Sequence, residues 1–274
     1  MSLSSELTAS SAQRRSSSRW YRPMFSPEHG VYVVLFVSFL TGAAAAQDWT
    51  WETTLALICA FCGFQAEHPW IMQVKQRSSL KVRFWVWGSI YTIAALSIAV
   101  LLGLNHPMLL WIYAGAIVAF GIDAISVLYR EQKSIFNEVT TFSAVCLSAP
   151  FAFIATGGTF SISIVGLWLL NTLFFSSTIF TVKFRKSKTP SIVPSIAYHV
   201  IASLIIVALW FFGVLAPITA LAITIALGKL AIVLIRQEWY RNAPIQSIAA
   251  LETGSAFLFL LITALSLLPA HLSV

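Results

Sequence analysis

Charged residues are scarce in this chain. Only 10% of the 274 residues are Asp, Glu, Lys or Arg, whereas 58% are hydrophobic. Soluble domains carry about 25% charged residues, so the composition excludes a soluble fold for most of the chain. A transmembrane helix needs about 20 mostly apolar residues. Nine such runs are present, at about 31–47, 53–74, 82–104, 107–129, 136–157, 160–182, 191–213, 215–235 and 246–268. The sequence therefore predicts an all-α integral membrane protein with nine transmembrane helices.

Cysteine is almost absent. The three cysteines are Cys59, Cys62 and Cys146, and all lie within apolar runs. Cys59 and Cys62 have the spacing of a redox motif, but no neighbouring group would lower a thiol pKa. Buried cysteine behaves as a small hydrophobic residue. We therefore expect these residues to pack inside the helix bundle rather than to take part in redox chemistry.

One face of the nine-helix arrangement has no Lys or Arg. The connections on this face lie near residues 47–52, 105–107, 156–159 and 213–217. All but one of the 17 basic residues lie on the opposite side, the exception being Lys229 inside the eighth run. Because Lys and Arg concentrate on the cytoplasmic side of membrane proteins, we expect the N-terminus inside and the C-terminus outside. The net charge of +7 is then a topology signal, and the expected partner is the lipid bilayer rather than a nucleic acid.

The first 26 residues differ from the rest of the chain. They are rich in Ser and Arg and poor in apolar residues, which predicts a disordered basic cytoplasmic leader over 1–26. A single transmembrane domain follows over 27–274. Residues 43–47 resemble a signal-peptidase site, but the long leader favours retention of the first span. Pro150 and Pro194 lie inside apolar runs and predict kinks in the fifth and seventh helices.

Ionisable residues inside the spans gather toward the basic side. Glu67 and His68 precede Lys75 by about two helical turns, which places them roughly 10 Å inside the bilayer. Asp123 lies at a similar depth before Arg130. Further polar residues near this side are Glu28, His29, Glu131, Asn137, Glu138, His199, Lys229 and Glu252. Because such side chains usually face a bundle interior or a water-filled cavity, the pattern predicts a polar cavity that opens to the cytoplasm.

Two Glu-His pairs are the candidate catalytic residues of this cavity. They are Glu67 with His68, and Glu28 with His29. A buried Glu-His pair can act as general acid and base, or relay protons in a transporter. This interpretation assigns proton-transfer chemistry to the cytoplasmic ends of the first two helices.

A second group of residues suits a substrate that carries an anionic group. Arg and Lys side chains bind phosphate and carboxylate well. The predicted substrate contacts are Arg130, Asn137, Glu138, Lys183 and Arg185. A structural alternative stays open, in which Glu28, Arg130, Asn137 and Glu138 tie the helix ends together.

A divalent metal is a weaker interpretation of the same region. Carboxylate and imidazole groups that suit such a metal are present at Glu28, Glu67, Glu138, His29, His68 and His199. Neighbouring Glu and His residues on one helix point about 100° apart, unlike the two histidines of an HExxH motif. We therefore assign no metal ligand, and the cofactor stays unknown.

Short motifs in the chain resemble a known family. They are Pro27–Gly30 before the first span, Arg130 with Asn137 and Glu138 before the fifth, and Val182–Arg185 ending the sixth. Together they resemble the YwiC-like bacterial membrane proteins. The resemblance implies a multi-pass protein of the inner membrane of a bacterium, with an internal photosynthetic membrane as the alternative. It implies no particular activity.

A more distant similarity is to the UbiA-type intramembrane prenyltransferases. That family has nine helices, a cytoplasmic N-terminus and a polar cavity beneath an apolar chamber, with Asp-rich Mg²⁺-binding motifs on helices 2 and 6. Here helix 2 offers only Glu67 and His68, and helix 6 ends in residues 181–185 without an acid. The similarity therefore implies a UbiA-like bundle that binds an isoprenoid or quinone headgroup without Mg²⁺-diphosphate chemistry.

Three classes of function follow from these patterns. The first is a protein that binds or modifies an amphipathic, isoprenoid-like lipid in a cytoplasm-facing cavity, which as an enzyme would be an intramembrane transferase. The second is a small-solute or proton-coupled transporter, with Asp123, Lys229 and Glu252 as coupling residues. The third is a non-catalytic membrane assembly factor in which the polar residues are structural.

Overall fold

The fold is helical throughout the residues that the structure, a computed structural model, describes. These are residue 21 and residues 23–76, 80–186 and 191–268, and they contain no strand. Most of the predicted leader over 1–26 lies outside them. The helices are α2 (His29–Ala46), α3 (Trp51–Gln76), α4 (Val82–Asn105), α5 (Leu109–Leu128), α6 (Ile135–Cys146), α7 (Ser148–Ala155), α8 (Ile162–Lys186), α9 (Val193–Phe211), α10 (Pro217–Leu221), α11 (Thr224–Ile235), α12 (Gln237–Asn242) and α13 (Ile245–Leu267).

Eight segments of the described chain are long and apolar enough to cross a membrane. Six are the single helices α2, α4, α5, α8, α9 and α13, and two are the helix pairs α6–α7 and α10–α11. Helix α3 has 26 residues, a length of roughly 39 Å, and packs along α4. It is less apolar than the others because it contains Glu52, Glu67, His68 and Lys75. The all-helical prediction is confirmed, whereas α3 as a ninth span stays a prediction.

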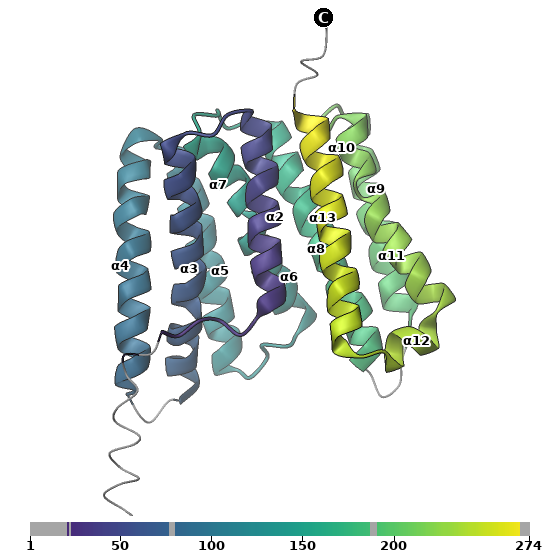
Figure 1. The fold of residues 1–274 in the computed structure, drawn as a ribbon, viewed down its shortest axis with the longest axis horizontal. Helices are drawn as coiled ribbons and strands as arrows, with labels where there is room; N and C mark the ends of the chain where they lie inside the picture. The colour runs from purple at the N-terminus through teal and green to yellow at the C-terminus, as the bar shows by residue number, and fades with distance from the viewer. Residues whose placement is uncertain (1–20, 22, 77–79, 187–190, 269–274) are drawn as a thin grey trace, which may run out of the picture.

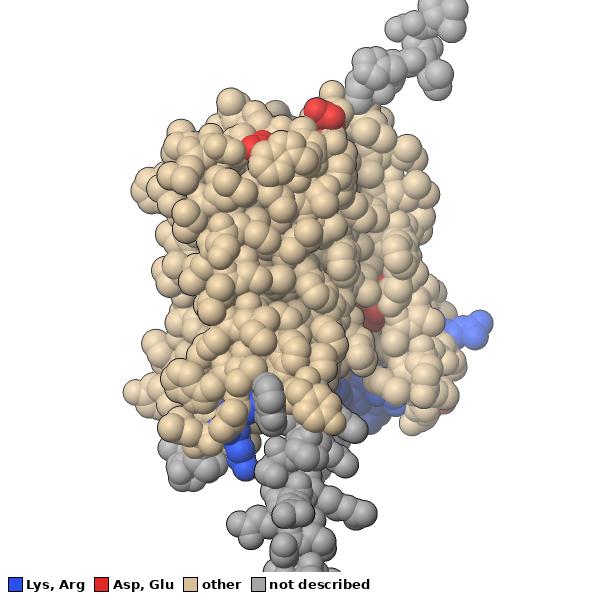
Figure 2. All heavy atoms as spheres, turned by 60° about the vertical axis from the view of Figure 1, so that its left-hand side comes forward, with Lys and Arg blue, Asp and Glu red and all other residues tan. Residues whose placement is uncertain are grey.

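The helices run side by side between two ends of the molecule (Figure 1). Helix α2 starts at the lower end of this view, and α13 ends at the upper end. In the middle of the bundle α2 contacts both α7 and α13. Figure 2 shows Lys and Arg side chains toward the lower end and a wide tan band of uncharged residues above them. This arrangement agrees with the segregation of basic residues in the sequence, and the side of the membrane that the lower end faces stays a prediction.

The two prolines predicted to kink helices behave differently. The fifth apolar run breaks into α6 and α7 at Leu147, and Pro150 then occupies the first turn of α7, where its missing N–H is tolerated. That prediction is confirmed. Pro194 lies in the first turn of α9, so the helix begins beside it instead of bending there. The predicted kink in the seventh helix is wrong because the helix starts later than the apolar run.

Close packing joins the two halves of the bundle around α2. Gly42 of α2 lies against the backbone of Ala149 in α7, and a Cβ atom at this position would overlap the Ala149 carbonyl oxygen. On the other side, Phe174 of α8 stacks on Phe259 of α13 with ring centroids 4.0 Å apart. These contacts fix the relative heights of the helices and so place the polar side chains near the basic end.

Candidate functional site

A ring of three hydrogen bonds holds the chain before α2 against α3. The Ser26 N–H donates to Gln65 Oε1 at 3.0 Å, and Gln65 Nε2 donates to the Tyr32 hydroxyl at 2.7 Å. The Tyr32 hydroxyl in turn donates to the Ser26 carbonyl at 3.0 Å. Gln65 is fully buried. This ring fixes the start of α2, and with it Glu28, beside the polar part of α3.

Three carboxyl groups from different elements share one region at the basic end. The Glu67 carboxyl, in α3, interacts electrostatically with Asp123 of α5 and with Glu28. Glu28 is exposed by its surface area, yet the surrounding protein removes enough water from its carboxyl to raise the pKa. Asp123 and Glu138 raise it further, whereas Lys75 lowers it. The carboxyl groups of Glu28 and Glu67 therefore lie within electrostatic range of each other, and the predicted polar cavity around them stays a prediction.

The histidines of the two Glu-His pairs lie apart from these carboxyl groups. His68 is half-buried and interacts with Lys75, whereas its neighbour Glu67 interacts with Asp123 and Glu28. His29 is exposed and stacks on Tyr32. Glu67 and His68 are adjacent on one helix and point in different directions, so these two side chains do not converge on one point. Their catalytic assignment stays a prediction.

Asn137 connects α6 to the buried end of α5. Its Nδ2 donates to Asp123 Oδ1 at 2.7 Å and to the Gln132 carbonyl at 3.2 Å. Its backbone N–H donates to Ser134 Oγ, which caps α6. Asn137 is 3% exposed, so it lies inside the bundle rather than at the rim. In this position it orients the Asp123 carboxyl.

The two basic residues at the end of α8 contact different parts of the protein. Lys183 forms an ion pair with Glu138 at 2.9 Å and donates to the Lys133 carbonyl at 2.7 Å. Arg185 donates to the carbonyls of Tyr240 and Ala243 at 3.2 and 2.7 Å. Glu138 and Lys183 thus join α6 to α8, and Arg185 anchors the segment around α12. Their predicted role as substrate contacts stays untested.

Arg130 lines a basic pocket at the same end of the bundle. The pocket has a volume of about 380 Å³ and is lined by Lys75, Val127, Arg130, Gln132 and Lys133. Arg130 has a φ of 64°, a left-handed conformation that is uncommon for residues other than glycine. It ends α5 and turns the chain toward α6. Of the residues that the structure describes, three cationic side chains and no acidic one line this pocket.

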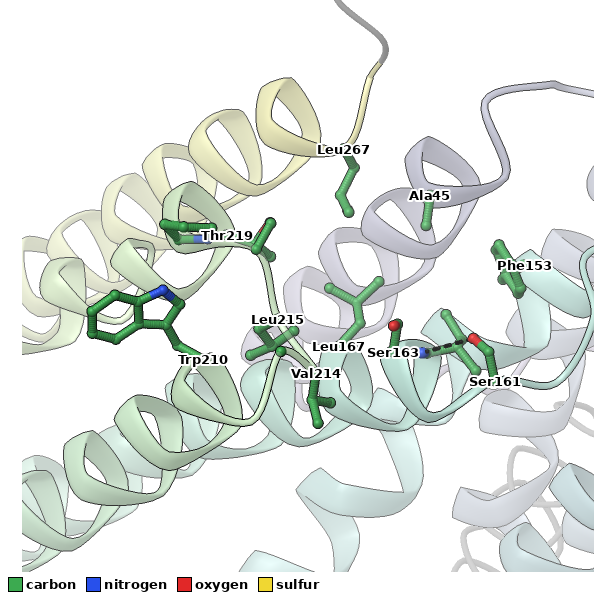
Figure 3. Close-up of a pocket in the computed structure, with 14 residues that line it drawn as sticks. Ala45, Phe153, Ser161, Ser163, Leu167, Trp210, Val214, Leu215, Thr219 and Leu267 are labelled. Carbon is green, nitrogen blue, oxygen red and sulfur yellow. Dashed lines mark hydrogen bonds between the residues drawn. The ribbon is translucent and has the colours of Figure 1, made fainter.

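A larger pocket of about 630 Å³ lies at the opposite end of the bundle. It is bounded by the start of α8, the connection from α9 to α10, and the ends of α2 and α13. In Figure 3 the apolar side chains of Leu167, Val214 and Leu215 lie together, while Leu267 and Ala45 approach from α13 and α2. None of the predicted site residues lines this pocket. The sequence signalled it only by the turn-forming Gly213 and Pro217.

A buried ion pair in the C-terminal half was not predicted as a pair. Lys229 of α11 donates to Glu252 Oε2 of α13 at 2.7 Å and to Thr178 Oγ1 of α8 at 2.9 Å. The Thr178 hydroxyl also donates to Glu252 Oε2 at 2.7 Å. Sequence reasoning placed Lys229 and Glu252 at similar depths but missed Thr178. The sequence feature that could have indicated this ion pair is a lysine and a glutamate that lie in different spans near the same end of the bundle.

Among the described residues, no group of three or more His, Cys, Asp or Glu side chains is arranged to hold a metal ion. The carboxyl groups of Glu28, Glu67 and Asp123 therefore lie within electrostatic range of one another without forming a ligand set.

Comparison with known proteins gives one finding. Residues 25–153 match the family described as YwiC-like protein. The matched segment runs from the loop before α2 into α7 and contains Glu28, Glu67, Asp123, Arg130 and Asn137. The predicted family resemblance is thus confirmed over this segment. No curated protein and no solved structure matches the chain, and the similarity to UbiA-type prenyltransferases stays a prediction.

Proposed function

We propose that this YwiC-like chain is a multi-pass membrane protein that binds an amphipathic lipid-like molecule by its anionic headgroup at the basic end of the bundle. The observation that carries this proposal is the pocket lined by Lys75, Arg130 and Lys133. Within the described part of the chain, no acidic side chain lines this pocket. A guanidinium group binds phosphate or carboxylate through two parallel hydrogen bonds, and basic pockets near the membrane surface suit lipid headgroups.

The neighbouring surface of α5 suits the apolar part of such a molecule. This helix ends at the basic pocket and carries large apolar side chains that are exposed along its length, namely Ile117, Val118, Phe120, Ile125 and Leu128. Exposed apolar side chains on a membrane helix contact lipid tails at no hydrophobic cost. A molecule with its headgroup in the pocket would therefore extend its tail along α5 into the bilayer.

The carboxyl cluster next to the pocket supplies groups for proton transfer. Lys75 lines the pocket and also interacts with the Glu28 carboxyl, and Glu28 interacts with Glu67. A headgroup bound at Lys75 would lie near these acids. If the protein modifies its ligand, Glu67 and Glu28 are our candidates for acid and base, with His68 on the Lys75 side. We place this pocket on the cytoplasmic side of a bacterial inner membrane.

The test is ligand-dependent thermal stability of the detergent-purified protein. We would compare a prenyl diphosphate with the matching prenyl alcohol, each with and without Mg²⁺. A ligand at about 100 times its Kd stabilises the folded state by about 2.7 kcal/mol. We expect the diphosphate, but not the alcohol, to raise the melting temperature. A rise that needs Mg²⁺ would indicate metal-assisted binding.

Two variants show whether the pocket is responsible. Arg130→Gln removes a cation from the pocket, and we expect it to remove most of the shift. Arg241→Gln removes an exposed cation from α12, outside the pocket, and should leave the shift intact. No shift with any anionic amphiphile, in protein that unfolds cooperatively, would contradict the proposal and favour transport or an assembly role.

A further inference from the structure

A second polar site lies between α8, α9, α11 and α13, in the half of the chain beyond the family match. Its centre is the ion pair of Lys229 and Glu252, bridged by the Thr178 hydroxyl. Lys229 is 3% exposed. Counted from the ends of their helices near the basic end, the three residues lie roughly 9 to 12 Å deep. A buried charge is retained at such depth only with partners, and it commonly marks a functional site.

His199 adds an unpaired acceptor to this site. Its side chain is buried, and its Nδ1 lies 2.7 Å from the Ser195 carbonyl oxygen. Because a carbonyl oxygen can only accept, Nδ1 carries the hydrogen, and Nε2 of the neutral ring bears a lone pair. Nε2 is buried and has no hydrogen-bond partner among the residues that the structure describes. His199 also interacts electrostatically with both Lys229 and Glu252.

Glu252 presents a second unpaired acceptor. Its Oε2 accepts from Lys229 and Thr178, whereas Oε1 is buried and has no partner in the described part of the chain. The hydroxyls of Ser195 and Ser203, one turn before and after His199 on α9, also lack partners. Buried polar atoms usually have a hydrogen-bond partner. Two unpaired acceptors with hydroxyl groups nearby therefore indicate a site that binds a hydrogen-bond donor.

We propose that His199 and Glu252, with Lys229 as fixed counter-charge, form a buried proton-binding site. The bound proton forms an N–H bond at His199 Nε2, and this group donates to a water molecule that in turn donates to Glu252 Oε1. The proton comes from hydronium, whose O–H bond breaks as the N–H bond forms and leaves a water molecule. No oxidant or reductant is needed, because proton transfer to neutral imidazole changes no oxidation state. Lys229 disfavours a metal cation at this position by repulsion, whereas Glu252 compensates the charge of the imidazolium.

The charged and titratable groups around His199 determine how readily it binds a proton. Lys229 on α11 and Glu252 on α13 act on His199 directly. Tyr198 packs edge-on against the imidazole ring from the same helix. Tyr240 of α12 interacts with Glu252 and with Arg185 of α8. The negative charge of Glu252 attracts a proton bound at His199, and the positive charge of Lys229 repels it.

The experiment is an NMR titration of the purified full-length protein with isotope-labelled histidine. His199→Gln identifies the His199 signal. We would follow the spectra over the whole pH range in which the protein stays folded, and we expect the His199 imidazole to gain a proton at Nε2 as the pH falls. A His199 signal unchanged over this range would overturn the proposal and leave a structural role.

Two substitutions should move the titration midpoint in opposite directions. Glu252→Gln removes the compensating charge and should move it to lower pH by one unit or more, a tenfold weaker proton affinity. Lys229→Met removes the repelling charge and should move it to higher pH. His106, paired with Glu52 at the other end of the bundle, is the control, and its signals should be the same in the wild type and in both variants. If the His199 titration midpoint is the same in Glu252→Gln as in the wild type, the proposal is contradicted. This comparison does not depend on whether Lys229→Met folds.

Discussion

The contact between Asp123 and Asn137 shows how single side chains organise the basic end. Asp123 is buried near the end of α5, and the Asn137 amide donates to it at 2.7 Å. Without this donor the carboxyl would lose a hydrogen bond in a place that water reaches poorly. The loss of a partner from a buried polar group costs more than the net value of the bond. One amide therefore positions a carboxyl group that faces Glu28 and Glu67.

Asn137→Leu should destabilise the protein by about 1–3 kcal/mol, because it leaves Asp123 without its donor. Chemical unfolding of the purified protein in mixed micelles measures this. The matched control is Glu138→Gln at the next position. Its ion pair with Lys183 is about a third exposed, and such pairs contribute about 0–1 kcal/mol. Equal losses in the two variants would contradict the role given to Asn137.

The raised pKa of Glu28 predicts a pH dependence of stability. Because the native state holds this proton more tightly than the unfolded chain, stability from Glu28 is present below its ordinary pKa of 4.5 and is lost as the pH rises through the folded value. Glu28→Gln should remove this loss, so that the variant melts higher than the wild type at neutral pH. Melting temperatures over a pH series measure the difference. Glu131→Gln, at an exposed position, should follow the wild type.

At the scale of elements, helix contacts decide which polar groups meet. Helix α2 reaches α7 closely because Gly42 has no side chain where it meets Ala149. Small residues allow such close approach between membrane helices. On the other side, α2 contacts α13, which carries Glu252. Helix α2 therefore connects two parts of the bundle. One is the segment that matches the family, and the other is the C-terminal half, which contains the buried ion pair.

Gly42→Ala should therefore destabilise the bundle, by about 1–3 kcal/mol, since the added methyl group forces α2 and α7 apart. Gly63→Ala is the matched control in α3, where a Cβ atom would meet nothing within 4 Å. Alanine is favoured over glycine within helices by about 1 kcal/mol, so this control should be neutral or stabilising. Unfolding of both variants under one set of conditions gives the comparison. A neutral Gly42→Ala would show that the two helices adjust freely.

At the scale of the whole molecule, charge is distributed by end. Basic side chains gather at one end of the bundle, while the pocket at the other end is mostly apolar (Figures 2 and 3). Positive charge on the cytoplasmic side sets the orientation of membrane proteins. Both proposed sites lie toward the basic end, so the orientation of the bundle determines from which compartment protons and headgroups would reach them.

Cysteine labelling in intact cells tests this orientation. Asp48→Cys and Thr159→Cys, at exposed positions of the upper end, should react with a membrane-impermeant maleimide. Glu131→Cys and Arg241→Cys, exposed at the basic end, should react only after permeabilisation. The native cysteines are buried or half-buried, so background should be low. Lys81→Cys, which follows α3, should behave like Glu131→Cys if α3 crosses the membrane. If it labels like Asp48→Cys, the nine-span prediction fails.

The sequence by itself determined the helical class, the positions of most spans and the segregation of basic residues. These features are local, because a run of about 20 apolar residues needs no partner to specify a membrane helix. It also placed Glu67, Asp123, Lys229 and Glu252 at similar depths, since rise per residue fixes height along a helix. The same reasoning placed Glu28 at the same end of the bundle as Glu67, but it did not predict that the two carboxyl groups interact.

Only the tertiary structure decided which groups of equal depth became neighbours. Depth does not specify the direction in which a side chain points or which helix lies beside it. The contact of Lys229 with Glu252 and Thr178 therefore could not be predicted from the sequence. For the same reason the sequence could not distinguish Arg185 from Arg130. Arg185 donates to backbone carbonyls near α12, whereas Arg130 lines the basic pocket. The apolar pocket around Leu215 likewise exists only because four helix ends meet there. Packing between helices that are distant in sequence determines which of these side chains are neighbours.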